Sequence, residues 1–206
     1  GTTAEMIAAL VTESTKVEVS DASLTISDTP TTDEYNALDA ATTGTITYGS
    51  GGTFTQIGSD IDGASADDYS GRSVSLSADG SVVAIGASHN DGNGSNSGHV
   101  RIFKNINNTW TQIGSDIDGE AVGDHSGHIN NLSLSDNGSV VAIGAIDNDG
   151  NGSSSGHVRI YRNINNTWTQ IGSDIDGEAA GDASGNSVSL SSDGSVVAID
   201  ALANDG

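Results

Sequence analysis

The sequence of 206 residues contains no cysteine, a single proline and only 4% aromatic residues. Without cysteine, neither disulfide bonds nor thiolate metal sites can stabilise the fold. No apolar run approaches the roughly 20 residues of a membrane-spanning helix, so we expect no membrane insertion. The hydrophobic fraction is 34%, and Gly, Ser, Thr, Asn and Asp, which favour turns, are abundant instead. This mixture favours many short strands joined by polar loops.

Positive charge is also scarce. Six Lys and Arg residues stand against 28 Asp and Glu, for a formal net charge of −22. Nucleic acids and anionic membrane surfaces bind proteins through basic patches, so nucleic acid is nearly excluded as a partner and an anionic membrane surface is disfavoured. Such a chain attracts cations, divalent ones above all. A salty extracellular medium would screen its self-repulsion, which favours a secreted or cell-surface location.

An internal repeat dominates the sequence from residue 54 onward. The segment Thr55–Gly63 recurs as Thr111–Gly119 and as Thr169–Gly177, at spacings of 56 and 58 residues. The two extra residues fall within His128–Asn131. A change of two residues leaves every later side chain on its original face of a strand, so the same strand pattern is expected in each copy.

One complete repeat predicts four short antiparallel strands. Ser73–Ser77 alternates polar and apolar residues, and Asp79-Gly80 is a strong hairpin signal before the continuously apolar Val82–Ala87. A Gly, Asn and Ser loop then leads to His99–Phe103, which alternates again, and to Trp110–Ile113. The continuous apolar run is typical of a strand that is covered on both faces.

Four strands in about 56 residues is the size of one β-propeller blade. Residues 51–206 hold two full repeats and part of a third, whereas propellers close with about four to eight blades. We therefore predict an all-β domain of tandem four-stranded antiparallel propeller-type blades, that is, an incomplete propeller. Its uncovered strand edges would lead the chain to associate with other copies of itself or with the rest of a longer chain.

Residues 1–50 differ from the repeat. Capping-box patterns predict short helices near residues 2–10 and 31–38. Between and after them, Val17–Val19, Leu24–Ile26 and Thr45–Tyr48 are predicted strands, and the flexible run Gly49–Gly52 marks the boundary. The predicted domain is a small mixed α/β module, and it resembles modules that occur in series within large bacterial surface proteins.

The repeat resembles the FG-GAP repeat of integrin α-chain propellers and of their bacterial relatives. The resemblance rests on Ser70-Gly71 followed by Val74-Ser75, and on the run from Ala84 to Ser88. Ser70 stands where the family has phenylalanine, and Ser88 where it has proline. The third copy departs further, with Asp200-Ala201 in place of Gly-Ala. The resemblance implies extracellular ligand binding or adhesion, often with Ca²⁺.

An acidic stretch follows the last strand of each repeat and is the main candidate metal site. Alternating carboxylates in a loop that contains glycine can supply several of the oxygen ligands that Ca²⁺ needs. The alternative interpretation is a solvated connection between blades. The candidate ligands are Asp60, Asp62, Asp68, Asp116, Asp118, Glu120, Asp124, Asp174, Asp176, Glu178 and Asp182.

Two other loops are possible calcium sites. Asp91–Ser95, repeated as Asp149–Ser153, has oxygen-bearing side chains at alternate positions, but any long hairpin loop favours the same residues. The calcium loop of the integrin family would lie between the first two strands of a blade. Only Ala78–Gly80 is present there, too short to surround an ion, so that site is not carried over.

Nothing in the sequence predicts an enzyme. Gly152–Gly156 matches the string around a hydrolase nucleophile but lacks the strand, turn and helix that it requires. His99 and His157 recur with the repeat, which favours a structural role, and Arg101 and Arg159 are expected to pair with carboxylates.

Trp110 and Trp168 start the fourth strand of their repeats. Their regular recurrence favours packing between blades over a platform for sugars. The sequence as a whole predicts an extracellular or cell-surface module for adhesion or structural assembly, with a surface protein or a glycan as a further ligand. The alternatives are a lectin-like, carbohydrate-binding propeller and the non-catalytic propeller part of an extracellular hydrolase.

Overall fold

The structure is a computed structural model that describes residues 24–26, 46–48 and 56–204. The chain divides into two compact parts, Gly1–Gln56 and Ile57–Gly206. In the first part, β1 (Leu24–Ile26) and β2 (Ile46–Tyr48) pair in parallel, at two of the three predicted strands. The third predicted strand and both predicted helices lie outside the described residues. The mixed α/β assignment of residues 1–50 therefore gains no support.

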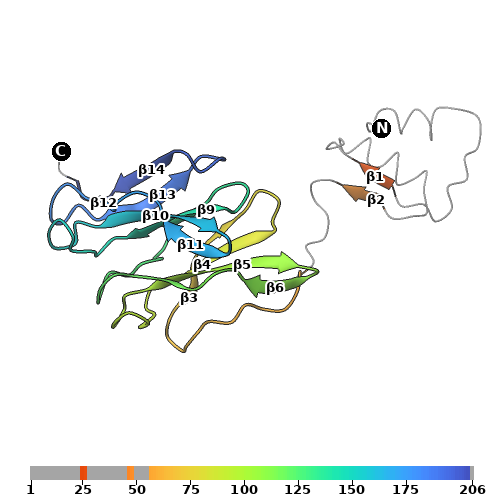
Figure 1. Cartoon of the computed structure of the whole chain (residues 1–206), viewed down its shortest axis with the longest axis horizontal. Helices are drawn as coiled ribbons and strands as arrows, with labels where there is room; N and C mark the ends of the chain where they lie inside the picture. The colour runs from red at the N-terminus through yellow and green to blue at the C-terminus, as the bar shows by residue number, and fades with distance from the viewer. Residues whose placement is uncertain (1–23, 27–45, 49–55, 205–206) are drawn as a thin grey trace, which may run out of the picture. The chain divides into compact units, whose positions relative to one another are not determined.

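The second part consists of three antiparallel sheets, one for each repeat (Figure 1). The first sheet contains β3 (Ser70–Leu76), β4 (Val82–Ala87), β5 (His99–Ile106), β6 (Thr109–Gln112) and β7 (Ile117–Asp118). The second sheet contains β8 (Leu132–Leu134), β9 (Val140–Ala145), β10 (His157–Ile164), β11 (Thr167–Gln170) and β12 (Ile175–Asp176). The third contains β13 (Ser184–Leu190) and β14 (Val197–Ala201). Residues 56–204 include no helix, and the all-β, incomplete-propeller prediction is confirmed.

Each complete sheet has one strand more than the sequence predicts. β6 pairs with the end of β5, and β7 pairs with its start, through His99 opposite Asp118. β12 pairs with β10 in the same way in the second sheet. The acidic stretch therefore begins as a short strand, which fixes the backbone of its first residues against the sheet.

The predicted hairpin at Asp79-Gly80 is present. The Asp79 carboxylate accepts hydrogen bonds from the Ser77 hydroxyl (2.8 Å) and from the backbone N–H of Ser81 (2.9 Å). These hydrogen bonds lower the pKa of Asp79 to about 2, because they favour the ionised carboxylate. Asp193 closes the equivalent hairpin of the third sheet in the same way.

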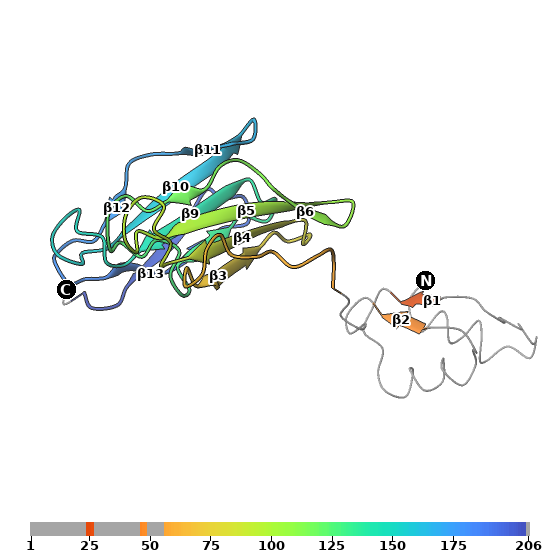
Figure 2. The same ribbon diagram turned by 90° about the horizontal axis from the view of Figure 1, so that it is seen from below.

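The sheets stack face to face in chain order (Figure 1), so that their strands overlap when seen along the stack (Figure 2). We call the face that a sheet turns toward the following repeat its trailing face, and the opposite one its leading face. A first apolar cluster joins the trailing face of the first sheet to the leading face of the second; it includes Val82, Ala84, Val100, Ile102, Leu132, Leu134, Val141 and Ile143. A second cluster joins the second sheet to the third, and includes Ala142, Val158, Val188, Leu190, Val197 and Ile199.

This stacking explains the continuous apolar run in the middle of each repeat. Every residue of β9 is buried, because the second sheet has a neighbour on both faces. In β14, whose sheet has a described neighbour on one face only, residues alternate between half-buried and exposed. The same sequence pattern therefore has a different burial in each copy, according to what covers it.

Glycine allows the closest approach between repeats. A Cβ atom on Gly86 would overlap the backbone carbonyl of Gly127, and one on Gly144 would overlap that of Gly185. The equivalent position in the third repeat is Asp200, which no later sheet of the described chain covers. The departure of the third copy from the Gly-Ala pattern thus falls where close backbone contact is not needed.

The two-residue insertion is absorbed at the start of the second sheet. β3 and β13 begin with a bulge, whereas β8 is only three residues long. In its place Asn131 is fully buried and donates a hydrogen bond of 2.8 Å to the Gly144 carbonyl. Leu132 and Leu134 keep the core-facing positions, as a two-residue change requires.

Candidate metal centre

Three of the candidate ligands, one in each repeat, have a clear structural role. Asp124 is almost completely buried, and its Oδ2 accepts hydrogen bonds from the N–H of Ala121 and the side-chain amide of Asn148, both 3.0 Å long. Asp68 and Asp182 make the same pair of bonds in their repeats. Each carboxylate thereby closes its own loop and ties it to the end of the second strand.

Backbone atoms of the acidic stretch hold neighbouring repeats together. The Arg159 guanidinium, on β10, donates a hydrogen bond of 2.7 Å to the Asp118 carbonyl in the first sheet. Arg101 donates to the Asp62 carbonyl in the same way. The sequence predicts that both arginines pair with carboxylates. Arg159 has such a partner, Glu120, at 3.6 Å, whereas the described contact of Arg101 is with the Asp62 carbonyl.

The structure brings two candidate ligands together with a histidine. Glu120, His157 and Asp174 each offer one ligand atom within 4.8 Å of the others. The Nδ1 atom of His157 lies 3.7 Å from Glu120 Oε2 and 4.0 Å from Asp174 Oδ2, both longer than a hydrogen bond. Glu120 follows β7 of the first sheet, whereas His157 and Asp174 belong to the second repeat. The cluster therefore spans the boundary between two repeats and could hold a metal ion.

Burial lowers the pKa of the His157 imidazole and so favours its neutral form. The side chain is 1% exposed, and desolvation, followed by the positive charge of Arg159, lowers its pKa below the ordinary value of 6.5. Its Nε2 atom is buried and has no hydrogen-bond partner among the described residues. A neutral imidazole has one nitrogen lone pair free to bind a metal.

The first repeat contains a truncated version of this cluster. His99 is buried like His157, and its Nδ1 lies 3.5 Å from Asp116 Oδ2. The position equivalent to Glu120 is Ala64, so the third ligand is missing. The repeat position of Glu120 recurs as Glu178, whose side chain is exposed.

The remaining candidate ligands are not members of this cluster. Asp176 lies in β12 opposite His157 in the sheet, but its carboxylate is not part of the group of ligand atoms. The carbonyl of Glu178 accepts a hydrogen bond of 2.9 Å from Asn151. The exposed Asp60 and Asp62 precede β3, where the first repeat lacks a glutamate.

The second candidate loop is held by its own hydrogen bonds. The Asp149 carboxylate accepts the N–H of Ser154 at 2.8 Å, and Asn151 donates to the backbone of the acidic stretch. Asp91 and Asn93 repeat both contacts in the first repeat. This pattern supports the interpretation of these residues as a structural loop.

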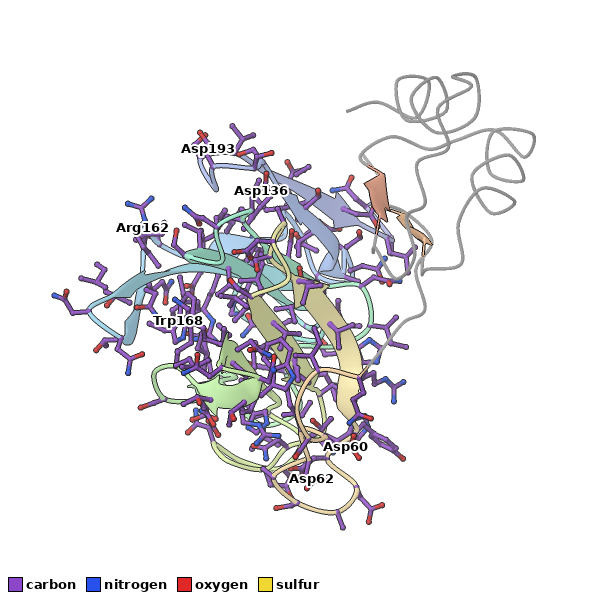
Figure 3. All side chains as sticks on the ribbon, turned by 90° about the vertical axis from the view of Figure 1, so that its right-hand side faces the viewer. Asp60, Asp62, Asp136, Arg162, Trp168 and Asp193 are labelled. Atoms are coloured by element: carbon purple, nitrogen blue, oxygen red, sulfur yellow. The ribbon has the colours of Figure 1, made fainter. Side chains whose placement is uncertain are left out.

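Both tryptophans contact the preceding repeat. The indole Nε1 of Trp168 donates to the Ile113 carbonyl, and that of Trp110 donates to the Ile57 carbonyl at 2.9 Å. Trp168 is half-buried and packs against the first apolar cluster, between the green and blue strands in Figure 3. These contacts support packing between repeats as the role of the tryptophans.

Comparison with known families agrees with this architecture. Residues 60–103 match the family model of the FG-GAP repeat. The match covers β3, β4 and the start of β5, and it confirms the resemblance for the first repeat. No curated protein sequence matches the chain. Among the described residues, no helix is long and apolar enough to cross a membrane.

Proposed function

We propose that this chain is an extracellular, non-catalytic module for adhesion or structural assembly, which associates through the same faces that stack its own repeats. The FG-GAP repeat supports the adhesion class, because such repeats are typical of extracellular proteins. The strongly negative charge, which a salty medium screens, supports the location.

The leading face of the first sheet is the observation that carries the proposal. Val74 and Leu76 are 63% and 57% exposed. Their equivalents in the second repeat, Leu132 and Leu134, are buried against the first sheet. An exposed apolar surface that is chemically the same as an internal interface is suited to bind the trailing face of another such repeat.

The trailing face of the third sheet offers the complementary surface. Val196 and Ala198 are exposed there, whereas their equivalents Val140 and Ala142 are buried in the second repeat. Head-to-tail pairing of two copies would also place Asp200 where Gly144 lies within the chain, against a neighbouring backbone. Asp200 therefore weakens association through this face without removing the apolar surface.

Sedimentation velocity across a salt series tests the proposal. Self-association is expected to increase as salt screens the charge of −22. Leu76→Lys should abolish it, and Asp200→Gly should strengthen it. Association that neither substitution changes, or a monomer at every salt and protein concentration, would contradict the proposal.

Carbohydrate binding is the second candidate function. A pocket beside Trp168 is lined by Gln112, Asp116 and Asn166, which provide hydrogen-bonding groups next to an aromatic ring. Sugars bind at such combinations of ring and polar groups. A glycan array with the wild type and Trp168→Phe tests this candidate: a glycan bound by both proteins but not by Asn166→Ala would favour it.

A further inference from the structure

The ligands at the boundary between the first two repeats are two carboxylates and an imidazole. Ca²⁺ prefers oxygen ligands alone, whereas imidazole suits Zn²⁺ and other divalent transition metals. The donor set of Glu120, His157 and Asp174 therefore differs in kind from the oxygen sites that the acidic stretch alone would offer. The buried imidazole, with Nδ1 directed at two carboxylates beyond hydrogen-bonding distance, indicates a ligand-binding role and distinguishes this site from a surface acidic patch.

The geometry requires little movement to close around an ion. Ligand atoms about 2.0 to 2.1 Å from a tetrahedral Zn²⁺ lie about 3.4 Å from one another. The distances from His157 Nδ1 to Glu120 and Asp174 are 3.7 and 4.0 Å. Both carboxylate side chains are partly exposed, so a small shift can bring their oxygens closer to the buried imidazole.

Each carboxylate is also oriented by a second residue. Gln170 donates a hydrogen bond of 2.6 Å to Asp174 Oδ1, which leaves Oδ2 directed at His157. Arg159 lies 3.6 Å from Glu120 Oε1, which leaves Oε2 directed at the same nitrogen. Outer partners that orient ligands in this way are a regular feature of metal sites.

We propose that Glu120, His157 and Asp174 bind one divalent transition-metal ion, with Zn²⁺ as the probe, and that this ion links the first repeat to the second. Because Glu120 comes from one repeat and the other two ligands from the next, the bound ion stabilises their stacking. The proposal is independent of self-association, which uses faces at the two ends of the array.

The repeats themselves provide the controls. Ala64 replaces the glutamate in the first repeat, so His99 and Asp116 form an incomplete site. Glu178 has the same repeat position as Glu120 and is exposed, without a histidine partner among the described residues. Glu120→Ala and Glu178→Ala therefore remove the same charge, but only the first removes a proposed ligand. Both residues are exposed, so both variants are expected to fold.

Isothermal titration calorimetry with ZnCl₂ on the chelator-treated chain, followed by thermal unfolding, tests the site. We expect one Zn²⁺ per chain whose affinity Glu120→Ala lowers at least about tenfold, since loss of an outer partner alone can cost that much. Glu178→Ala should leave the affinity and the Zn²⁺-induced rise in Tm unchanged. Ala64→Glu should create one additional site by completing the set with His99 and Asp116.

Equal Zn²⁺ binding by Glu120→Ala and Glu178→Ala would overturn the proposal. So would Ca²⁺ displacing Zn²⁺ at equal concentration, because an imidazole site should discriminate against Ca²⁺. Zinc bound elsewhere, for example at the partly buried His89, His125 and His128, would persist in both variants and would be recognised in that way.

Discussion

The indole nitrogen of Trp168 donates a hydrogen bond of 2.8 Å to the backbone carbonyl of Ile113, one repeat earlier in the chain. The same ring packs against the apolar cluster between the first and second sheets. Trp168→Ala should therefore lower the free energy of unfolding by about 2 to 3 kcal/mol, below the range for a fully buried tryptophan. Trp168→Phe should cost about 1 kcal/mol, for the hydrogen bond alone. Chemical denaturation measures both values. If Trp168→Ala leaves the free energy of unfolding nearly unchanged, packing is not the role of Trp168.

Gly144 provides a second test of the stacking. Gly144→Ala should destabilise the chain by about 1 to 3 kcal/mol, because its Cβ would meet the backbone of Gly185 in the third repeat. Asp200→Ala, at the equivalent position of the third repeat, is the control and should be close to neutral. Thermal unfolding of the two variants compares them, and equal losses of stability would contradict the assigned interface.

Most strands of the repeat could be predicted from the sequence. The predicted strands agree with the structure to within a few residues, because alternation and the Asp-Gly hairpin are local signals. The sequence did not predict β7 and β12, because two-residue strands have no periodicity to detect. Residues 1–50 show the same limit: two predicted strands are present, and the helices stay predictions.

The metal cluster could not be predicted from local spacing. Glu120 meets His157 and Asp174 only because two sheets stack, and β12, which follows Asp174, pairs with β10 at His157. The recurrence of His157 as His99 in the first repeat predicts a structural role instead. One signal was available. Glu120 and Glu178 share a repeat position that Ala64 occupies in the first copy, so a glutamate precedes the second repeat but not the first.

A decrease in pH is expected to destabilise the chain through His128. Burial, followed by the positive charge of Arg72 and electrostatic repulsion from His125, lowers the pKa of His128, with His89 adding to this effect and Asp147 opposing it. The unfolded chain then takes up a proton near pH 6.5 that the folded chain resists, so stability falls as pH decreases below about 6.5. His128→Gln should make the dependence of Tm on pH shallower between pH 7 and 5, because the variant lacks the proton that His128 binds in the unfolded chain. An unchanged slope would contradict this assignment.

Calcium binding by the acidic stretches stays a prediction. Millimolar Ca²⁺ is expected to raise Tm more than Mg²⁺ or NaCl at matched ionic strength, because an ion that binds only the native state stabilises it. The effect should persist in Glu120→Ala if it arises from oxygen ligands elsewhere in the stretches. Equal shifts with all three salts would reduce the effect to screening of the negative charge.

The most direct test of assembly through the stacking faces uses the absence of cysteine from the chain. Leu76→Cys places one thiol on the leading face of the first sheet, and Ala198→Cys places one on the trailing face of the third. A short bismaleimide added at high salt should cross-link a mixture of the two variants into heterodimers. Each variant alone should give far less product, because head-to-tail pairing never brings two like faces together. Heterodimers in clear excess are the predicted result; equal yields in all three samples, or none, would contradict assembly through these faces.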